Sequence, residues 1–162
     1  MAEKRVLRET TPESVAAVQG LIAAARYGAL ATISPEDGAP IATRVGLASL
    51  DGVPLILVSA LAAHTGALRA DPRCSLLVGE VGKGDPLAHK RATLKCRARE
   101  IAHGGAEYDA ARQAYLSAQP KAALYVDLPD FAFMLLEPLS ASYNAGFGKA
   151  YALSGEELAR EG

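Results

Sequence analysis

Apolar residues recur along this chain with two periods, one typical of helices and the other typical of strands. Val15, Val18 and Ile22 recur at helical spacing, which predicts a helix over about residues 12–25. A helical period returns over residues 106–118. Shorter apolar runs, bounded by glycine, proline and aspartate, predict strands over residues 27–33, 40–49, 55–58, 75–81, 91–101, 131–136 and 139–145.

Short polar connections join most of these strands. Residues 34–38 and 50–52 carry the proline, aspartate and glycine of tight turns, so we expect the first three strands to form an antiparallel meander. We also expect the last two strands to pair with each other. Six or seven strands joined in this way predict an α+β fold that is mainly β, an antiparallel barrel with peripheral helices. Residues 1–162 are expected to form a single domain.

The segment from Pro54 to Val81 combines an apolar strand, a short helix and a second apolar strand. His64 and Thr65 stand where the cap of the short helix is expected, and Asp71-Pro72 ends it. A helix start offers unpaired backbone N–H groups, here beside a hydroxyl and an imidazole. This arrangement predicts an anion site suited to a phosphate.

Basic residues on two strands are further candidates. Arg44 carries the only charge between Ile41 and Leu50, and it could face solvent, a carboxylate or an anionic ligand. Over residues 91–101 apolar side chains alternate with mostly basic ones, which predicts a strand with one buried and one basic face. A basic face of this kind is more often solvated than a binding site.

Composition limits the possible partners. The net charge of −1 and the pI near 6.3 give no overall attraction to nucleic acid or to an anionic membrane, so we expect neither as a partner. Apolar runs are too short to span a bilayer, and the N-terminus has no secretory pattern. Cys74 and Cys96 form no CxxC motif, which favours reduced thiols in the cytoplasm, although a bridge between them stays open.

No motif for catalysis or metal binding stands out. The spacing of the polar residues fits no metal site, phosphate-binding loop, dinucleotide fingerprint or catalytic triad. His64, His89 and His103 are too far apart in the sequence to indicate a zinc site. We therefore name no catalytic residue and no metal ligand.

Three segments together carry a family resemblance. GALAT, GAPIATRVGLASLDGVPLILVSALAAHTGALRADPRCSLLV and GDPLAHKRATLKCRAREI resemble the flavin-binding split-barrel superfamily that includes pyridoxamine 5′-phosphate oxidase. Within it, the haem-utilisation branch called HugZ is the most similar. The likeness is strong over residues 28–101 and looser over residues 131–150. It implies a split β-barrel and a homodimer with two FMN sites at the subunit interface.

The resemblance also implies which residues bind the cofactor. The strand around Arg44 would line the flavin ring, and the segment around His64 would lie near the phosphate. The expected cofactor-binding residues are Arg44, Val45, Gly46, Leu47, Val58, Ser59, His64, Thr65 and Arg91. The first prediction is therefore an FMN-dependent oxidoreductase with an undefined small-molecule substrate, whose chemistry would belong largely to the flavin.

Two alternatives stay open. The same interface could hold haem, for binding or degradation, with its propionates on Arg91 or Lys95; a cofactor-free dimer is the third possibility. Gly66 stands where the family commonly has a basic residue, and one missing charge-assisted hydrogen bond costs about 1.5–3 kcal/mol. Pyridoxamine phosphate oxidation is not expected, because a counterpart of that enzyme's C-terminal substrate segment is missing. We likewise expect no haem ligand of the kind carried by the C-terminal domain of longer haem-utilisation proteins.

Overall fold

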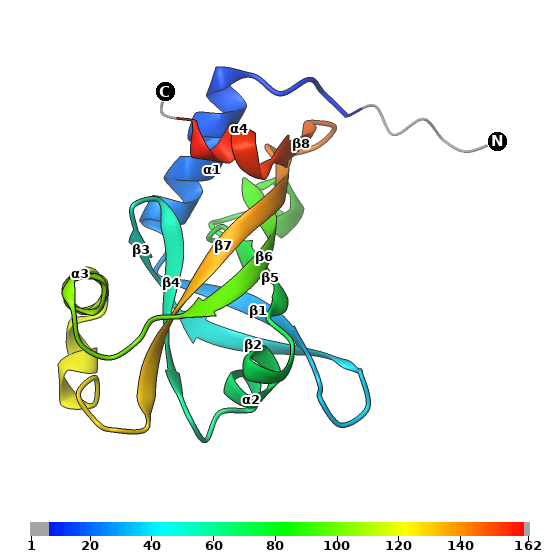
Figure 1. Cartoon of the computed structure of the whole chain (residues 1–162). Coiled ribbons are helices and arrows are strands. Elements are labelled where there is room, and N and C mark those ends of the chain that lie inside the picture. Colours follow the sequence, from blue (N-terminus) through cyan, green and yellow to red (C-terminus); the bar gives the residue numbers. More distant parts are fainter. Residues whose placement is uncertain (1–6, 161–162) are drawn as a thin grey trace.

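One antiparallel sheet of eight strands, curled into a half-barrel, organises the computed structural model, which describes residues 7–160 (Figure 1). The strand order is β2-β1-β5-β6-β7-β4-β3, and β8 pairs with β7. The strands are β1 Tyr27–Ile33, β2 Pro40–Gly46, β3 Ala48–Leu50, β4 Val53–Ser59, β5 Arg73–Val78, β6 Arg91–Glu100, β7 Phe131–Asn144 and β8 Ala150–Ser154. The helices are α1 Pro12–Ala24, α2 Ala63–Ala70, α3 Ala106–Ala118 and α4 Gly155–Ala159, with short 3₁₀ turns η1 Pro86–Ala88 and η2 Pro120–Leu124. The predicted α+β split barrel is confirmed, with one strand more than the upper estimate.

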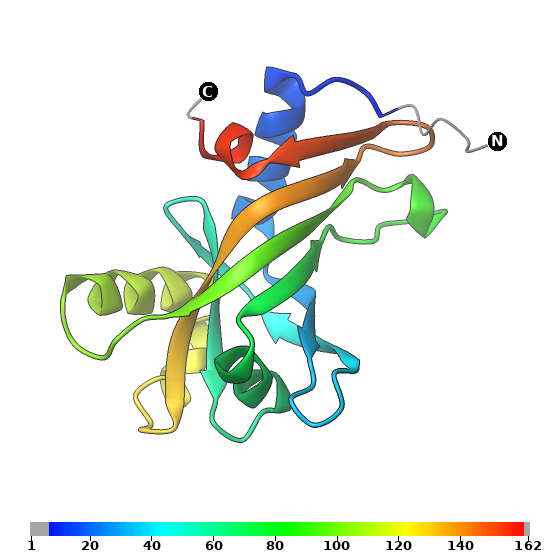
Figure 2. The same ribbon diagram turned by 45° about the vertical axis from the view of Figure 1, so that its right-hand side comes forward.

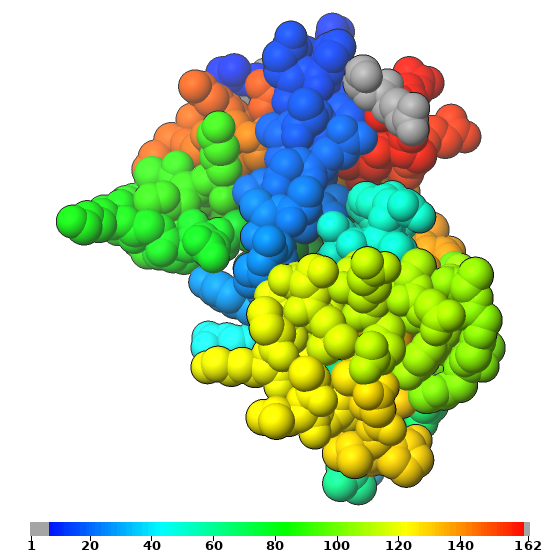
Figure 3. Space-filling view, turned by 90° about the vertical axis from the view of Figure 1, so that its left-hand side faces the viewer, coloured from blue at the N-terminus to red at the C-terminus, as the bar shows by residue number. Residues whose placement is uncertain are grey.

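Two apolar cores hold the layers together. The larger one fills the inside of the curled sheet, with Leu30, Ile56, Leu76 and Leu94 at its centre and α1 packed against it. A smaller core centred on Phe133 lies on the other side of β4 and β7, under α3 and η2. Figure 3 shows α3 and η2 on the surface below α1. No helix within residues 7–160 is both long and apolar enough to cross a membrane.

Local signals place α1 and β6 as predicted. The Thr11 hydroxyl accepts a hydrogen bond from the Ser14 backbone N–H and forms a capping box, which fixes the start of α1. On β6 the side chains of Ala92, Leu94 and Cys96 are buried, and the residues between them face outward. The alternation of apolar and polar residues therefore does report one buried face.

The predicted meander of the first three strands is wrong only in its middle strand, because both antiparallel hairpins are present. Residues 40–49 form two strands, because Leu47 leaves the ladder: its N–H donates to the Arg26 carbonyl and its side chain enters the core. The β1–β2 hairpin and the β3–β4 hairpin then lie at opposite ends of the strand order. On the side away from its hairpin partner, β1 pairs with β5, and β4 likewise pairs with β7. Each hairpin is therefore extended into the sheet by a strand that is distant in the sequence.

The predicted pair of strands over residues 131–136 and 139–145 is also wrong. They form the single strand β7, which pairs with β4 through its first half and with β8 through its second. Pro138 does not interrupt β7, because the pairing with β6 shifts there: Cys96 opposes Pro138 and Lys95 opposes Ser140, so that Leu139 is the extra residue of a bulge. Proline lacks an N–H group and is tolerated in sheets at bulges.

Two of the differences at element ends bear on the candidate site. The cap residue of α2 is Ala62, which makes no side-chain cap bond, so His64 and Thr65 lie in the first turn and do not cap the helix. Strand β5 ends at Val78, because Gly79 takes a φ of +130° that ordinary side chains avoid. Strand β1 and helix α3 match their predicted ranges.

The two cysteines lie directly opposite each other on β5 and β6. Cys74 and Cys96 are both buried and are free thiols, as predicted. Burial raises the pKa of the Cys74 thiol to about 11 and raises the pKa of the Cys96 thiol further. Both side chains are therefore protonated core residues at neutral pH.

Candidate ligand-binding site

A hollow of about 310 Å³ lies on the outer face of the sheet, where β2, β1 and β5 run side by side. Its floor is formed by Ala29, Leu77 and Gly79, and Tyr27 and Arg44 stand beside it. Ala29 opposes Arg44 on one side and Leu77 on the other, which places all three on the outward face. The hollow thus combines an apolar floor with one aromatic ring and one cation.

Gly79 lets the end of β5 and the start of β6 approach closely beside the floor. A Cβ atom at this position would lie 2.5 Å from the carbonyl oxygen of Lys90, and the φ of +130° is strained for any other residue. The same Cβ would lie 2.9 Å from the Cα of Arg91, so β6 approaches the hollow closely here. Only glycine fits this position.

Arg44 is exposed, and its charge is available to a ligand. Its guanidinium carbon lies 6.0 Å from the centre of the Tyr27 ring, at the outer limit of a cation–π contact. It forms no ion pair with any residue of the described chain. A carboxylate was one of the three possible partners of Arg44, and none pairs with it within residues 7–160.

Helix α2 is joined to β2 next to Arg44. The Nδ1 atom of His64 lies 3.2 Å from the Oγ1 atom of Thr43. Half-burial lowers the pKa of His64 from its usual 6.5, so the imidazole is neutral at pH 7. His64 therefore links the two elements and adds no positive charge.

The two hydroxyls near the start of α2 are used inside the protein. Thr65 is 1% exposed, and its hydroxyl donates to the Ser59 carbonyl oxygen at 2.5 Å. The Ser59 hydroxyl accepts a hydrogen bond from the Leu61 N–H at 3.2 Å. Gly66 follows on the exposed side of the helix, with nothing within 4 Å of a Cβ placed there. This helix start therefore presents no cationic side chain for a phosphate, although its backbone could still contribute.

Four of the residues expected to bind cofactor offer no accessible side chain. The side chains of Val45, Leu47 and Val58 are buried in the main core. Gly46 is covered by Tyr115, whose hydroxyl oxygen would lie 2.9 Å from a Cβ at that position. Any contact from these four residues would be made by the backbone.

Gln119 fixes the end of β2 and was not among the residues expected from the sequence. Its Nε2 donates to the carbonyl oxygens of Arg26 at 2.5 Å and Leu47 at 3.0 Å. It comes directly after α3 and before Pro120, where the sequence gives only a helix-ending signal. No local pattern could have indicated that α3 packs beside β2.

Arg91 lies on the outward face of β6, next to the floor of the hollow. Its Nη1 donates to the carbonyl oxygens of Leu87 at 2.9 Å and His89 at 3.2 Å, so part of the guanidinium is used in its own loop. Lys95 lies on the same face, opposite Ser75, and forms no ion pair within residues 7–160. It lines a second hollow, of about 340 Å³, and not the one beside Arg44.

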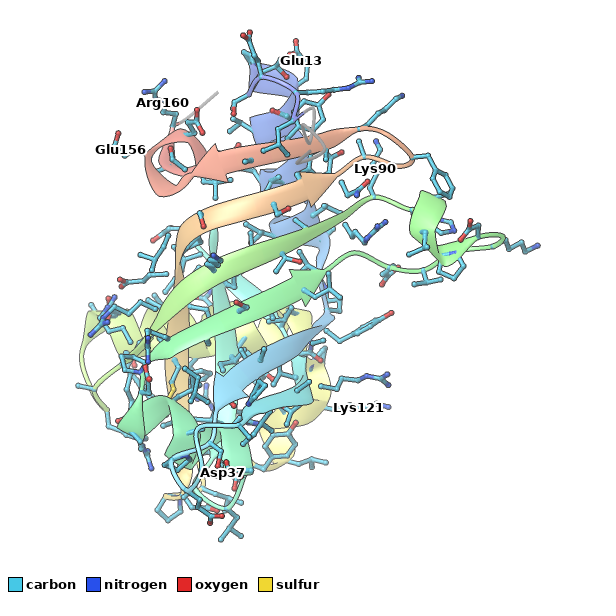
Figure 4. The ribbon with its side chains drawn as sticks, turned by 90° about the vertical axis from the view of Figure 1, so that its right-hand side faces the viewer. Glu13, Asp37, Lys90, Lys121, Glu156 and Arg160 are labelled. Carbon is cyan, nitrogen blue, oxygen red and sulfur yellow. The ribbon has the colours of Figure 1, made fainter. Side chains whose placement is uncertain are left out.

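The face around these residues carries mostly small side chains. In register across the strands, Ala29, Leu77, Thr93 and Ser142 form one outward row; Ala31, Ser75, Lys95 and Ser140 form the next. Figure 4 shows these strands from the front, with α1 and α3 behind them. Small residues let another surface approach the sheet closely, so this face suits packing against a second sheet.

Known proteins resemble this chain in sequence and in structure. Residues 14–145 match the family model described as pyridoxamine 5′-phosphate oxidase. The non-canonical heme oxygenase HOZ of Arabidopsis thaliana, a chloroplast protein, is 37% identical over 131 residues, which cover 80% of this chain and 39% of that protein. A heme binding protein from Mycobacterium smegmatis has 33% identity and a TM-score of 0.85, over 93% of this chain and 61% of its own. The chain thus spans less than two thirds of the length of each of these relatives.

A more distant structure shares the fold alone. Campylobacter jejuni ChuZ has 16% identity and a TM-score of 0.79, over 95% of this chain and 63% of its own. Together with the matches above, it confirms the resemblance to the split-barrel superfamily drawn from the sequence motifs.

Proposed function

Because this chain belongs to the pyridoxamine 5′-phosphate oxidase family, we propose that it binds haem as a homodimer, with the porphyrin against the hollow beside Arg44. The observation that carries the proposal is an exposed arginine without a carboxylate partner in the described chain, standing over an apolar floor. A haem ring is flat and mostly apolar, and its two propionates are anions.

The residues present fit such a ligand. Ala29, Leu77 and Gly79 provide a surface on which a flat ring can lie, and Tyr27 provides an aromatic edge. In this proposal Arg44 would meet one propionate, and the part of the Arg91 guanidinium that its loop does not use would meet the other. Bound haem would supply the iron, while these residues bind and orient the ring.

Two relatives support this choice of ligand. Their names give haem as what they bind or act on, and both are more than 30% identical to this chain. Because the chain spans only 39% and 61% of them, the proposal for this chain is binding, and degradation of the ring is not included.

The homodimer is supported by the outer face of the sheet. A volume of about 310 Å³ is at the lower end of the 300–1,000 Å³ typical of ligand pockets, so one chain would cover a porphyrin only in part. A second copy packed on the small-residue face would cover the rest. The ligand site and the dimer interface would then be continuous.

FMN is the second candidate, although the sequence motifs alone placed it first. His64 contacts Thr43, the residue before Arg44 on β2, and the family resemblance expects the cofactor in this region. However, an FMN phosphate carries nearly two negative charges, and the helix start provides no cationic side chain: the His64 imidazole is neutral, and the Thr65 hydroxyl already donates to the Ser59 carbonyl oxygen. FMN-dependent oxidoreduction therefore stays a prediction, and the cofactor-free dimer ranks third.

Titration of the purified apoprotein with each ligand tests the order of these candidates. We expect a shifted Soret band that saturates at micromolar haem, and little quenching of FMN fluorescence over the same range of protein concentration. Absence of a saturable Soret shift would contradict the proposal. Tight FMN binding together with weak haem binding would reverse the order of the two ligands.

A further inference from the structure

Two loops project side by side from one end of the sheet, beyond the body of the molecule (Figures 2 and 3). One joins β5 to β6 and contains η1; the other joins β7 to β8. They touch, since a Cβ on Gly146 would lie 3.3 Å from the Ala88 carbonyl oxygen. We call residues 79–90 and 145–149 together the double tip.

The double tip exposes large apolar side chains. Val81, Leu87 and Phe147 are 62%, 58% and 72% exposed. Single exposed apolar residues are ordinary, but a group of them on two touching loops marks an interaction surface. The residues from Glu80 to Ala88 are all exposed, so no other part of the described chain covers this loop.

Polar side chains of the same loop turn inward and brace it. Arg91 donates to the Leu87 and His89 carbonyl oxygens, and the Nε2 atom of His89 lies 2.9 Å from the Lys83 carbonyl oxygen. The Asp85 carboxylate accepts a hydrogen bond from the Leu87 N–H at 2.9 Å. These hydrogen bonds fix the conformation of the loop while its apolar side chains stay exposed to solvent. Such preorganisation lowers the entropy cost of binding a partner.

Cations surround the apolar side chains. Lys83, Lys90 and Lys149 are exposed and form no ion pair with any of residues 7–160. Figure 4 shows Lys90 beside the base of the two loops. Glu80 and Asp85 also lie in the double tip, and Asp85 is engaged with the backbone of η1. The three lysines outnumber the two carboxylates, so the double tip is slightly positive on a chain whose net charge is −1.

We propose that the double tip docks the protein on an anionic phospholipid surface. The projecting shape lets the three apolar side chains enter the lipid interface while the lysines meet headgroup phosphates. We expected no membrane partner because the net charge of the chain is close to zero. A net charge does not reveal a local group of lysines such as the one in the double tip. The proposal does not depend on haem or FMN binding. Its main competitor is a second copy of this chain covering the same loops.

Flotation of the full chain with vesicles tests the proposal. At low salt we expect binding to vesicles with 30% phosphatidylglycerol in phosphatidylcholine, and at least tenfold weaker binding to phosphatidylcholine alone. The double variant Leu87→Ser/Phe147→Ser should bind at least tenfold more weakly. The matched control is Leu61→Ser/Leu124→Ser, because those side chains are 91% and 87% exposed but lie outside the double tip. This control should bind as the unmodified protein does.

Further measurements separate the possible failures. Replacing each lysine of the double tip with glutamine should weaken binding to anionic vesicles about fivefold. Circular dichroism and the melting temperature verify that each variant folds. No vesicle binding by the unmodified protein overturns the proposal, as does an equal loss in the control variant. A change of oligomeric state in Leu87→Ser/Phe147→Ser, with vesicle binding unchanged, would assign the loops to a second copy.

Discussion

The Nδ1 atom of His64 lies 3.2 Å from the hydroxyl oxygen of Thr43 and thereby joins α2 to the strand that carries Arg44. The half-buried imidazole has a lowered pKa, because desolvation disfavours its charged form. The position of α2 beside the candidate site therefore depends on a neutral histidine.

Acid should loosen this link. The pKa of His64 is lower in the folded protein than in the unfolded chain, so its contribution to stability is complete above about pH 6.5 and falls as the pH drops through the lowered pKa. The free energy of unfolding, measured with urea at pH 7.5 and 5.5, should fall more for the unmodified protein than for His64→Gln. The exposed His103 supplies the control His103→Gln, which should behave as the unmodified protein does. An equal loss in His64→Gln would refute the link.

Arg44→Ala should weaken haem binding by about one to two decades, because it removes a charge-assisted hydrogen bond of about 1.5–3 kcal/mol. The dissociation constant from Soret titration measures the effect. Arg97→Ala is the matched control: Arg97 is an exposed cation on β6 that does not line the hollow. If both variants bind haem as the unmodified protein does, the ligand lies elsewhere.

Gly66→Lys should create FMN affinity. The position is exposed on α2 with open space around it, and a lysine there would add one cation near the helix start. The expected gain is about one to two decades in the FMN dissociation constant, measured by fluorescence quenching. Gly66→Gln also replaces the helical glycine and so stabilises the helix to a similar extent, but it adds no charge. This variant should not gain FMN affinity. A gain in both variants would point to helix stability as the cause.

The sequence located most elements but not how they assemble. Turn residues and alternation found β1, β6 and both hairpins, because these signals are local. Local signals could not show that β1 pairs with β5 and β4 with β7, because strand pairing of this kind depends on contacts between residues distant in the sequence. A bulge at Leu139 kept β7 continuous through Pro138, which a local rule scores as a break.

The candidate site was predicted in part. Arg44 was found because it is an isolated charge in an apolar strand. Tyr27, Leu77 and Gly79 were missed as its neighbours, because they come from strands that meet only in the folded sheet. The start of α2 looked like a free anion site, but its hydroxyls brace the turn that leads into the helix.

Two buried threonines allow a direct test of what a hydrogen bond of a buried hydroxyl contributes to stability. Thr32 is buried, and its hydroxyl has no hydrogen-bond partner among residues 7–160, whereas the buried Thr65 hydroxyl donates to Ser59. Thr32→Val keeps the shape and removes the unpaired hydroxyl, so the free energy of unfolding should rise by about 1 kcal/mol. Thr65→Val should lower it by about 1–3 kcal/mol, because it leaves the Ser59 carbonyl short of a donor. Urea unfolding of both variants measures the difference, and a loss of stability in Thr32→Val would contradict the assignment.

The small-residue face of the sheet should be the dimer interface. Thr93 lies in the outward row of this face, opposite Leu77 and Ser142, where a new carboxylate would be buried between two copies without a partner. Thr93→Glu should convert a dimer into a monomer in light scattering, and it should weaken haem binding because the ring would lose its second wall. Gln113→Glu, on the exposed surface of α3, adds the same charge away from this face and should stay dimeric. A monomeric unmodified protein, or a dimer that Thr93→Glu leaves intact, would remove this face from the proposed site.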